Sequence, residues 1–111
     1  MTRPNINLNF NVTFRHTEST PALKTYAIDK VDHCVRKYLT HDGDIKVILA
    51  VEKRDHSVEV VLHSKGHEAT ATASTHDLYS AVDKVVDALE AQLRKQKDKN
   101  TQHHKQVAAE F

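Results

Sequence analysis

The longest uninterrupted periodic segment of the chain covers residues 74–99. Its apolar side chains recur every three or four positions, which places them on one stripe of an α-helix. These residues are Leu78, Val82, Val85, Leu89 and Leu93. Ser74 and Asp77 predict the start of the helix, since a hydroxyl N-cap followed three residues later by a carboxylate resembles a capping box. The chain must therefore bury one side of a long helix against another layer.

Charges are ordered along this helix. Acidic residues come early, at Asp77, Asp83, Asp87 and Glu90, and basic residues come late, at Arg94, Lys95, Lys97 and Lys99. This order opposes the helix macrodipole at both ends and creates a basic patch on a chain whose formal net charge is only +1. If the protein binds a polyanion, we expect the contact at the end of this helix.

Length and composition indicate one small domain. A chain of 111 residues has room for a single core, and we assign residues 5–99 to that domain. Cys34 is the only cysteine, so no internal disulfide can form and a reducing compartment is favoured. The first ten residues lack the apolar run of a signal peptide, and no segment has the apolar length of a membrane span. We therefore expect a cytoplasmic protein with no membrane partner.

The segments before residue 74 predict one strand, one helix and three more strands. Residues 5–14 alternate strictly between apolar and polar, which is typical of a strand with one buried face. Thr20 and Pro21 predict an N-cap and the first position of a helix that ends near residues 40–43. Residues 45–52, 57–63 and 67–73 read as strands, the first of them central because it is apolar on both faces. Short connections, the second with Gly66, predict hairpins.

The element order is β-α-β-β-β-α, and each helix has one apolar stripe. We therefore predict an α+β two-layer sandwich in which both helices pack on one face of a four-stranded sheet. The last strand is small and threonine-rich, which suits a weakly packed edge. Residues 100–111 are polar and without periodicity, so we predict a flexible C-terminal tail.

Residues for enzyme chemistry are not found in the sequence. The chain has two glycines, and neither lies in a phosphate-binding loop. Cys34 falls on the apolar stripe of the first helix, where a thiol is a small core residue with a raised pKa. The nine histidines lack the spacing of a zinc site. We therefore expect no catalysis, no cofactor, no metal and no small-molecule substrate.

Helical wheels sort the basic residues into flanks. In the first helix Lys30 and Lys37 share a flank with His33. In the second helix Lys84, Lys95 and Lys99 share one flank, whereas Arg94 and Lys97 share the other with Asp83 and Glu90. Two helices side by side could join such flanks into a cationic groove that binds RNA. The alternative is a solvated surface with weak local ion pairs.

Three segments resemble one protein family. They are TPALKTYAIDKV, VILAVEK and, above all, DLYSAVDKVVDALEAQLRKQKDK. With the order of elements, they make the chain similar to the ribosome hibernation promoting factor family in its short form. The resemblance implies a non-enzymatic translation factor that is active in stationary phase or stress. Such a factor blocks the mRNA and tRNA path of the small ribosomal subunit, and its basic helix surfaces face 16S rRNA.

The resemblance and the helical wheels together give the candidate rRNA-binding residues. They are Lys24, Lys30, His33, Lys37, Lys84, Arg94, Lys95, Lys97 and Lys99. Off the ribosome we expect a monomer. Ala88 and Ala91 stand where the family usually has Lys and Arg, and Phe14 stands where a glycine commonly ends the first strand. Ala88 and Ala91 keep an alternative open, a generic α+β RNA-binding or adaptor module without a ribosomal role.

Overall fold

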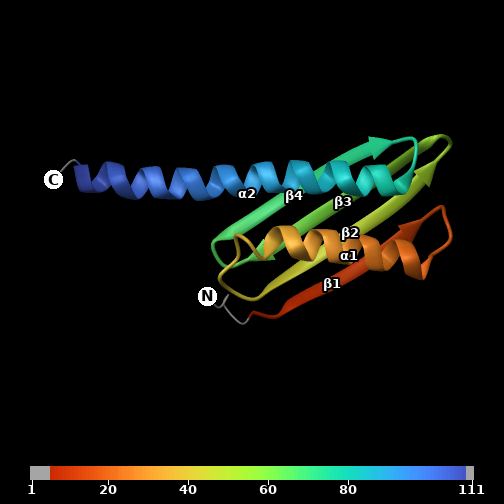
Figure 1. The fold of residues 1–111 in the computed structure, drawn as a ribbon, viewed down its shortest axis with the longest axis horizontal. Coiled ribbons are helices and arrows are strands. Elements are labelled where there is room, and N and C mark those ends of the chain that lie inside the picture. Colours follow the sequence, from red (N-terminus) through yellow and green to blue (C-terminus); the bar gives the residue numbers. More distant parts are fainter. Residues whose placement is uncertain (1–5, 110–111) are drawn as a thin grey trace.

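The structure, a computed structural model, describes the backbone of residues 6–109 and the side chains of residues 6–96. The elements in chain order are β1 (Leu8–Arg15), α1 (Pro21–Val35), β2 (Gly43–Glu52), β3 (Asp55–Ser64), β4 (His67–Thr75) and α2 (Leu78–Ala109). One sheet has the order β1-β2-β3-β4, with β1 parallel to β2 and the other pairs antiparallel. Both helices lie on the same face of this sheet (Figure 1), which confirms the predicted β-α-β-β-β-α sandwich.

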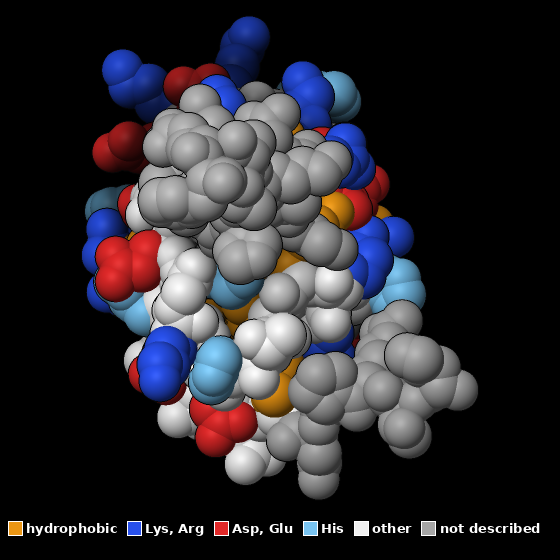
Figure 2. Space-filling view, turned by 90° about the vertical axis from the view of Figure 1, so that its left-hand side faces the viewer, with side chains coloured by type: hydrophobic (Ala, Val, Ile, Leu, Met, Phe, Trp, Pro, Cys, Tyr) orange, Lys and Arg blue, Asp and Glu red, His pale blue; other side chains and the backbone are white. Residues whose placement is uncertain are grey.

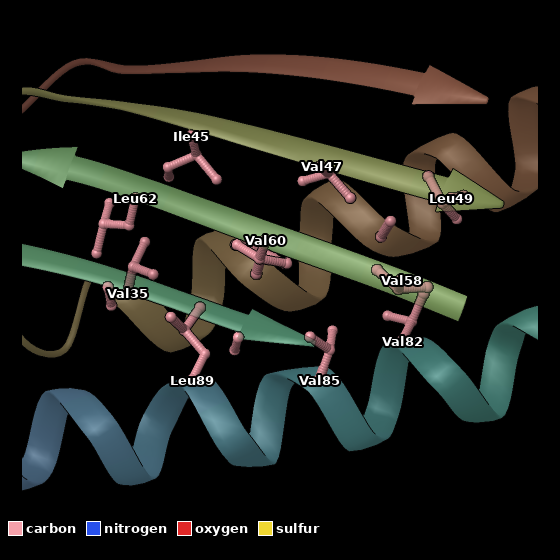
Figure 3. Close-up of a cluster of buried hydrophobic side chains, with 14 of the residues drawn as sticks. Val35, Ile45, Val47, Leu49, Val58, Val60, Leu62, Val82, Val85 and Leu89 are labelled. Atoms are coloured by element: carbon pink, nitrogen blue, oxygen red, sulfur yellow. The ribbon is translucent and has the colours of Figure 1, made fainter. Parts of the chain in front are cut away.

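The core fills the space between the helices and the sheet. In β2 and β3, Ile45 is in register with Leu62, Val47 with Val60, and Leu49 with Val58, and all six are buried. Val35 of α1 and Val82, Val85 and Leu89 of α2 close the same cluster (Figure 3). The buried cluster consists of valine, leucine, isoleucine and alanine side chains.

The central position of β2 explains its apolar character on both faces. Ile45, Val47 and Leu49 point toward the helices, because they alternate along the strand and join the core cluster. Ile48 faces the other way and is still buried, in register between Thr13 of β1 and Glu59 of β3. The prediction of a central strand is confirmed.

The two helices begin at different kinds of cap. Thr20 Oγ1 accepts a hydrogen bond of 3.3 Å from the Leu23 amide, and Pro21 is the first residue of α1, as predicted. The predicted cap of α2 is wrong, because Ser74 is held extended in β4 opposite Ser57. Asp77 caps α2 instead, since its carboxylate accepts bonds from the amide and hydroxyl of Ser80, at 3.0 and 2.7 Å. These two bonds hold the pKa of Asp77 below its usual value, and the bond from the Ser80 hydroxyl has the larger effect.

The helix ends also differ from the predictions. α1 ends at Val35, earlier than predicted, because the Tyr38 amide bonds back to the Val35 carbonyl and tightens the chain into a turn. α2 continues past Lys99 to Ala109 and projects beyond the sheet (Figure 1). No proline or glycine interrupts residues 100–109, so nothing in the sequence stops this helix. The predicted flexibility of residues 100–111 is not tested, since their side chains and the last two residues are outside the described part.

The edge strand β4 is covered by α2 along part of its length. Ala69 and Ala71 are buried, so this edge is better packed than its composition predicts. The side-chain amides of Gln92 and Gln96 donate hydrogen bonds to backbone carbonyls of β4, at 2.7 and 2.8 Å. These bonds satisfy carbonyl groups that another strand would otherwise pair with. α2 is therefore fixed to the sheet by polar contacts as well as by its apolar stripe.

Candidate nucleic-acid interface

The first part of the contact between α1 and α2 is built on two tyrosines. The Tyr26 hydroxyl donates a hydrogen bond of 2.6 Å to Asp83 Oδ1. The rings of Tyr26 and Tyr79 meet edge to face, with centroids 4.9 Å apart. Lys30 Nζ lies 5.5 Å from the centroid of the Tyr26 ring, within the range of a cation–π contact. The hydrogen bond to Asp83 raises the pKa of Tyr26 above its usual value.

The second part of this contact is built on Glu90. Lys37 Nζ donates to Glu90 Oε2 at 2.7 Å, and the Tyr38 hydroxyl donates to the same oxygen at 3.0 Å. Arg94 Nη2 lies 3.7 Å from that oxygen. The hydrogen bond between Lys37 and Glu90 lowers the pKa of Glu90 and raises the pKa of Lys37. Two of the candidate rRNA-binding cations therefore share one carboxylate.

Among the side chains that the structure describes, the contact between the helices has the local ion pairs of the alternative reading rather than a cationic groove. The flank of α2 that packs against α1 is the one that carries Asp83, Glu90 and Arg94. The carboxylates of Asp83 and Glu90 neutralise part of the positive charge of Lys30 on α1 and of Lys37 in the turn after it. Figure 2, which looks at the end of the molecule where α2 projects, shows basic and acidic side chains interspersed around that end. The charge of this contact is mixed.

Lys84 and Lys95 lie on the other flank of α2, away from α1, and both are exposed. Eleven residues separate them, about three helical turns, so they point in similar directions. Among the side chains that the structure describes, no carboxylate lies within ion-pair distance of Lys84 or Lys95. These two lysines are therefore available to an outside anion.

The remaining candidates are dispersed. His33 is exposed on α1. Lys24 lies at the β1 side of α1, where it lines a hollow of about 820 Å³ together with Asn9, Phe10 and Val12. The side chains of Lys97 and Lys99 are outside the described residues, although their backbone belongs to α2. Lys24 is therefore separate from Lys37 and Arg94, which share Glu90.

The two alanines that replace usual basic residues have different environments. Ala88 is half-buried and packs against the core, whereas Ala91 is exposed on α2. A basic residue at position 91 would project into solvent on the outer side of the helix. Of these two positions, Ala91 is thus the one where the absence of a basic residue removes a charge that an outside partner could contact.

Cys34 belongs to the core. Burial raises the pKa of its thiol to about 11, and its Sγ lies 4.0 Å from the Val86 carbonyl oxygen. This confirms the prediction of a buried cysteine with a raised pKa. In the part of the chain that is described, no three His, Cys, Asp or Glu residues gather as a metal site would require. Neither described helix has the length and hydropathy to cross a bilayer.

Sequence reasoning missed the roles of Tyr38 and Glu90. From the sequence alone, Tyr38 has no assigned role, and Glu90 is placed only among the acids of its helix. Both lie at the contact because the turn after α1 brings Tyr38 to a residue 52 positions further along the chain. No local pattern signals a contact at that separation.

The comparisons with known proteins agree with this fold. Residues 10–101 match the family model described as Sigma 54 modulation protein / S30EA ribosomal protein. The ribosome hibernation promoting factor of Escherichia coli K12 is 35% identical over 96 residues, which cover 86% of this chain and all of that relative. Its Pseudomonas putida counterpart is 34% identical over 92 residues, covering 83% of this chain and 89% of that relative.

Solved structures give the same picture. A ribosomal subunit interface protein from Coxiella burnetii superposes with a TM-score of 0.72 and 25% identity, covering 81% of this chain and 98% of that one. The N-terminal domain of Protein Y from Thermus thermophilus gives a TM-score of 0.71 and 26% identity, covering 80% and 97%.

Proposed function

This chain belongs to the Sigma 54 modulation protein / S30EA ribosomal protein family, and from that membership we propose that it is a ribosome hibernation factor. Such a protein binds ribosomes in resting or stressed cells and keeps them inactive by occupancy, so it needs no catalytic step. The observation that carries the proposal is the match to a hibernation promoting factor along that relative's whole length. An adaptor module without a ribosomal role is not favoured, because the match is not confined to a shared scaffold.

The partner within the ribosome is the small subunit, and the ligand is 16S rRNA along the mRNA and tRNA path. In support, the helix layer presents exposed lysines at Lys30, Lys84 and Lys95. Lysines on a rigid helix contact phosphates, which gives affinity that depends on RNA shape rather than sequence. The protein acts in the cytoplasm, where ribosomes are, and is a monomer when free.

The binding surface runs along the outer side of α2 and includes the side of α1 that carries Lys30. Lys84 and Lys95 supply charges that no described carboxylate neutralises, and Lys97 and Lys99 follow on the same helix. The open face of the sheet is a poorer candidate, because acids such as Asp44, Glu59 and Glu68 outnumber its basic residues, Arg15 and Lys46. Association through α2 should therefore weaken as salt rises.

Sedimentation tests the proposal. Purified protein is mixed with ribosomes and run on sucrose gradients at several salt concentrations, with the Lys84→Glu/Lys95→Glu variant beside it. We expect the wild type to migrate with ribosomal particles at low salt and the variant to stay at the top of the gradient.

The matched control is Lys53→Glu, since Lys53 is exposed in the turn after β2, at the end of the sheet where α2 begins (Figure 1). This control should migrate as the wild type does. A wild type that stays free at low salt refutes the hibernation proposal. Co-migration of the Lys84→Glu/Lys95→Glu variant would move the binding surface elsewhere.

A further inference from the structure

Three hydrogen-bond donors converge on one oxygen atom at the contact between the helices. Lys37 Nζ and the Tyr38 hydroxyl lie 2.7 and 3.0 Å from Glu90 Oε2, and Arg94 Nη2 lies 3.7 Å from it. Lys37 and Tyr38 both belong to the turn after α1, whereas Arg94 comes from α2. Two cations and a hydroxyl that meet at one point from two segments form a site for an anionic oxygen.

The oxygen at that point now belongs to the protein itself. The Lys37 and Arg94 side chains are 38% and 64% exposed, so an outside anion can reach both cations. The Glu90 side chain is 23% exposed and lies at the rim of the core rather than inside it. A carboxylate in this place resembles a phosphate oxygen in charge and in hydrogen-bonding capacity.

We propose that Lys37, Tyr38 and Arg94 form a phosphodiester-binding site for RNA, and that Glu90 is a built-in competitor whose carboxylate the phosphate displaces. This site rests on the proposed function and adds to it, because it assigns a binding role to Tyr38 and an opposing role to Glu90. We refer to the four residues as the Glu90 cradle.

The physical basis is an exchange of one anion for another. Ion pairs at this degree of exposure are weak and are screened by salt, so the carboxylate can be displaced. A phosphodiester has two non-bridging oxygens, whereas the contacts within the protein converge on the single oxygen Glu90 Oε2. Because the phosphate must first displace Glu90, Lys37 and Arg94 add less to affinity than the unneutralised Lys84 and Lys95. Glu90 thus limits binding to RNA that places a phosphate at this point.

The test compares Glu90→Gln with Asp87→Asn in equilibrium binding to purified small subunits over a range of salt. Both variants remove one negative charge from α2. Asp87 is exposed three residues earlier, and no described cation lies within ion-pair distance of it. We expect Glu90→Gln to bind about three- to tenfold more tightly at low salt, the equivalent of one or two released exposed ion pairs. Asp87→Asn should change affinity less than about twofold.

The salt dependence and a double variant make the test specific. Release of Lys37 should steepen the plot of log affinity against log salt by about 1. Adding Lys37→Gln to Glu90→Gln should cancel most of the gain, because the freed cation is then missing. If Glu90→Gln unfolds at the assay temperature, Glu90→Ala removes the same charge with a strong helix former.

The outcomes separate the cradle from the proposed function. A wild type that does not bind small subunits overturns the proposed function and the cradle with it. A wild type that binds, beside a Glu90→Gln variant no tighter than Asp87→Asn, overturns the cradle alone. Weaker binding by Glu90→Gln also overturns it, because Glu90 would then position Lys37 and Arg94 for RNA instead of competing for them.

Discussion

Replacing Lys84 and Lys95 together by glutamine should reduce the salt dependence of ribosome binding by a calculable amount. Both side chains are exposed on one flank of α2, and no carboxylate of a described residue lies within ion-pair distance of either. Each lysine can therefore give its full charge to a phosphate, which contributes about 0.7 to 0.9 to the slope of log affinity against log salt. The double variant should lose about 1.4 to 1.8 from that slope. Over a fourfold rise in salt, the affinity ratio between wild type and variant should then fall by about tenfold.

The assay is fluorescence anisotropy of labelled protein with purified small subunits at constant magnesium and varied potassium. Lys53→Gln is the control, because it removes an exposed lysine from the turn after β2 rather than from α2, and it should leave the slope unchanged. Lys37→Gln should change the slope less than loss of Lys95 alone, since Lys37 is paired with Glu90 at 2.7 Å. If the Lys84→Gln/Lys95→Gln variant keeps the wild-type slope while Lys53→Gln reduces it, the assignment of the surface to α2 is refuted.

Three further predictions concern the scaffold and its charge. Leu89 is fully buried, so Leu89→Ala should lower the free energy of unfolding by about 3 to 5 kcal/mol and the melting temperature by about 10 to 20 °C in calorimetry; a drop of a degree or two would contradict the packing. Ala91→Lys adds a charge on the exposed side of α2 and should tighten ribosome binding with a slope steeper by about 0.7 to 0.9, whereas unchanged binding would place residue 91 away from RNA. The bonds from Ser80 hold the pKa of Asp77 below its usual range, so this carboxylate stabilises the fold at neutral pH and the contribution is lost as pH falls through the lowered pKa. Denaturation curves across acid pH should show that loss in the wild type and not in Asp77→Asn.

Much of the fold could be predicted from the sequence because the local patterns agree with the tertiary structure. Strict alternation in residues 5–14 predicts β1, and the stripe from Leu78 to Leu93 predicts α2. Thr20 and Pro21 predict the start of α1 because the cap geometry involves only neighbouring residues. The positive φ of Gly66, 86°, likewise follows from its place in a hairpin.

The errors occur where distant contacts decide. Ser74 has the chemistry of an N-cap, but pairing with Ser57 keeps it in β4 and the next suitable residue, Asp77, caps the helix. The charges on each helix left open whether a cationic groove or an ion-paired surface forms, because they do not show which flank of α2 meets α1. The structure settles this through Tyr26 with Asp83 and Lys37 with Glu90, pairs that lie 57 and 53 positions apart.

Hydroxyl-radical cleavage of rRNA from a tethered probe tests the proposed binding surface most directly. The native Cys34 is 2% exposed and its pKa is raised to about 11, so a probe attached at neutral pH reacts with an introduced cysteine. Ala91→Cys places the probe on the exposed side of α2, and Thr72→Cys places it on the open face of the sheet. We expect strong cleavage of small-subunit rRNA along the mRNA path from position 91 and weak cleavage from position 72. Strong cleavage from position 72 with none from position 91 would show that the protein binds through its sheet, and would contradict the role given to α2.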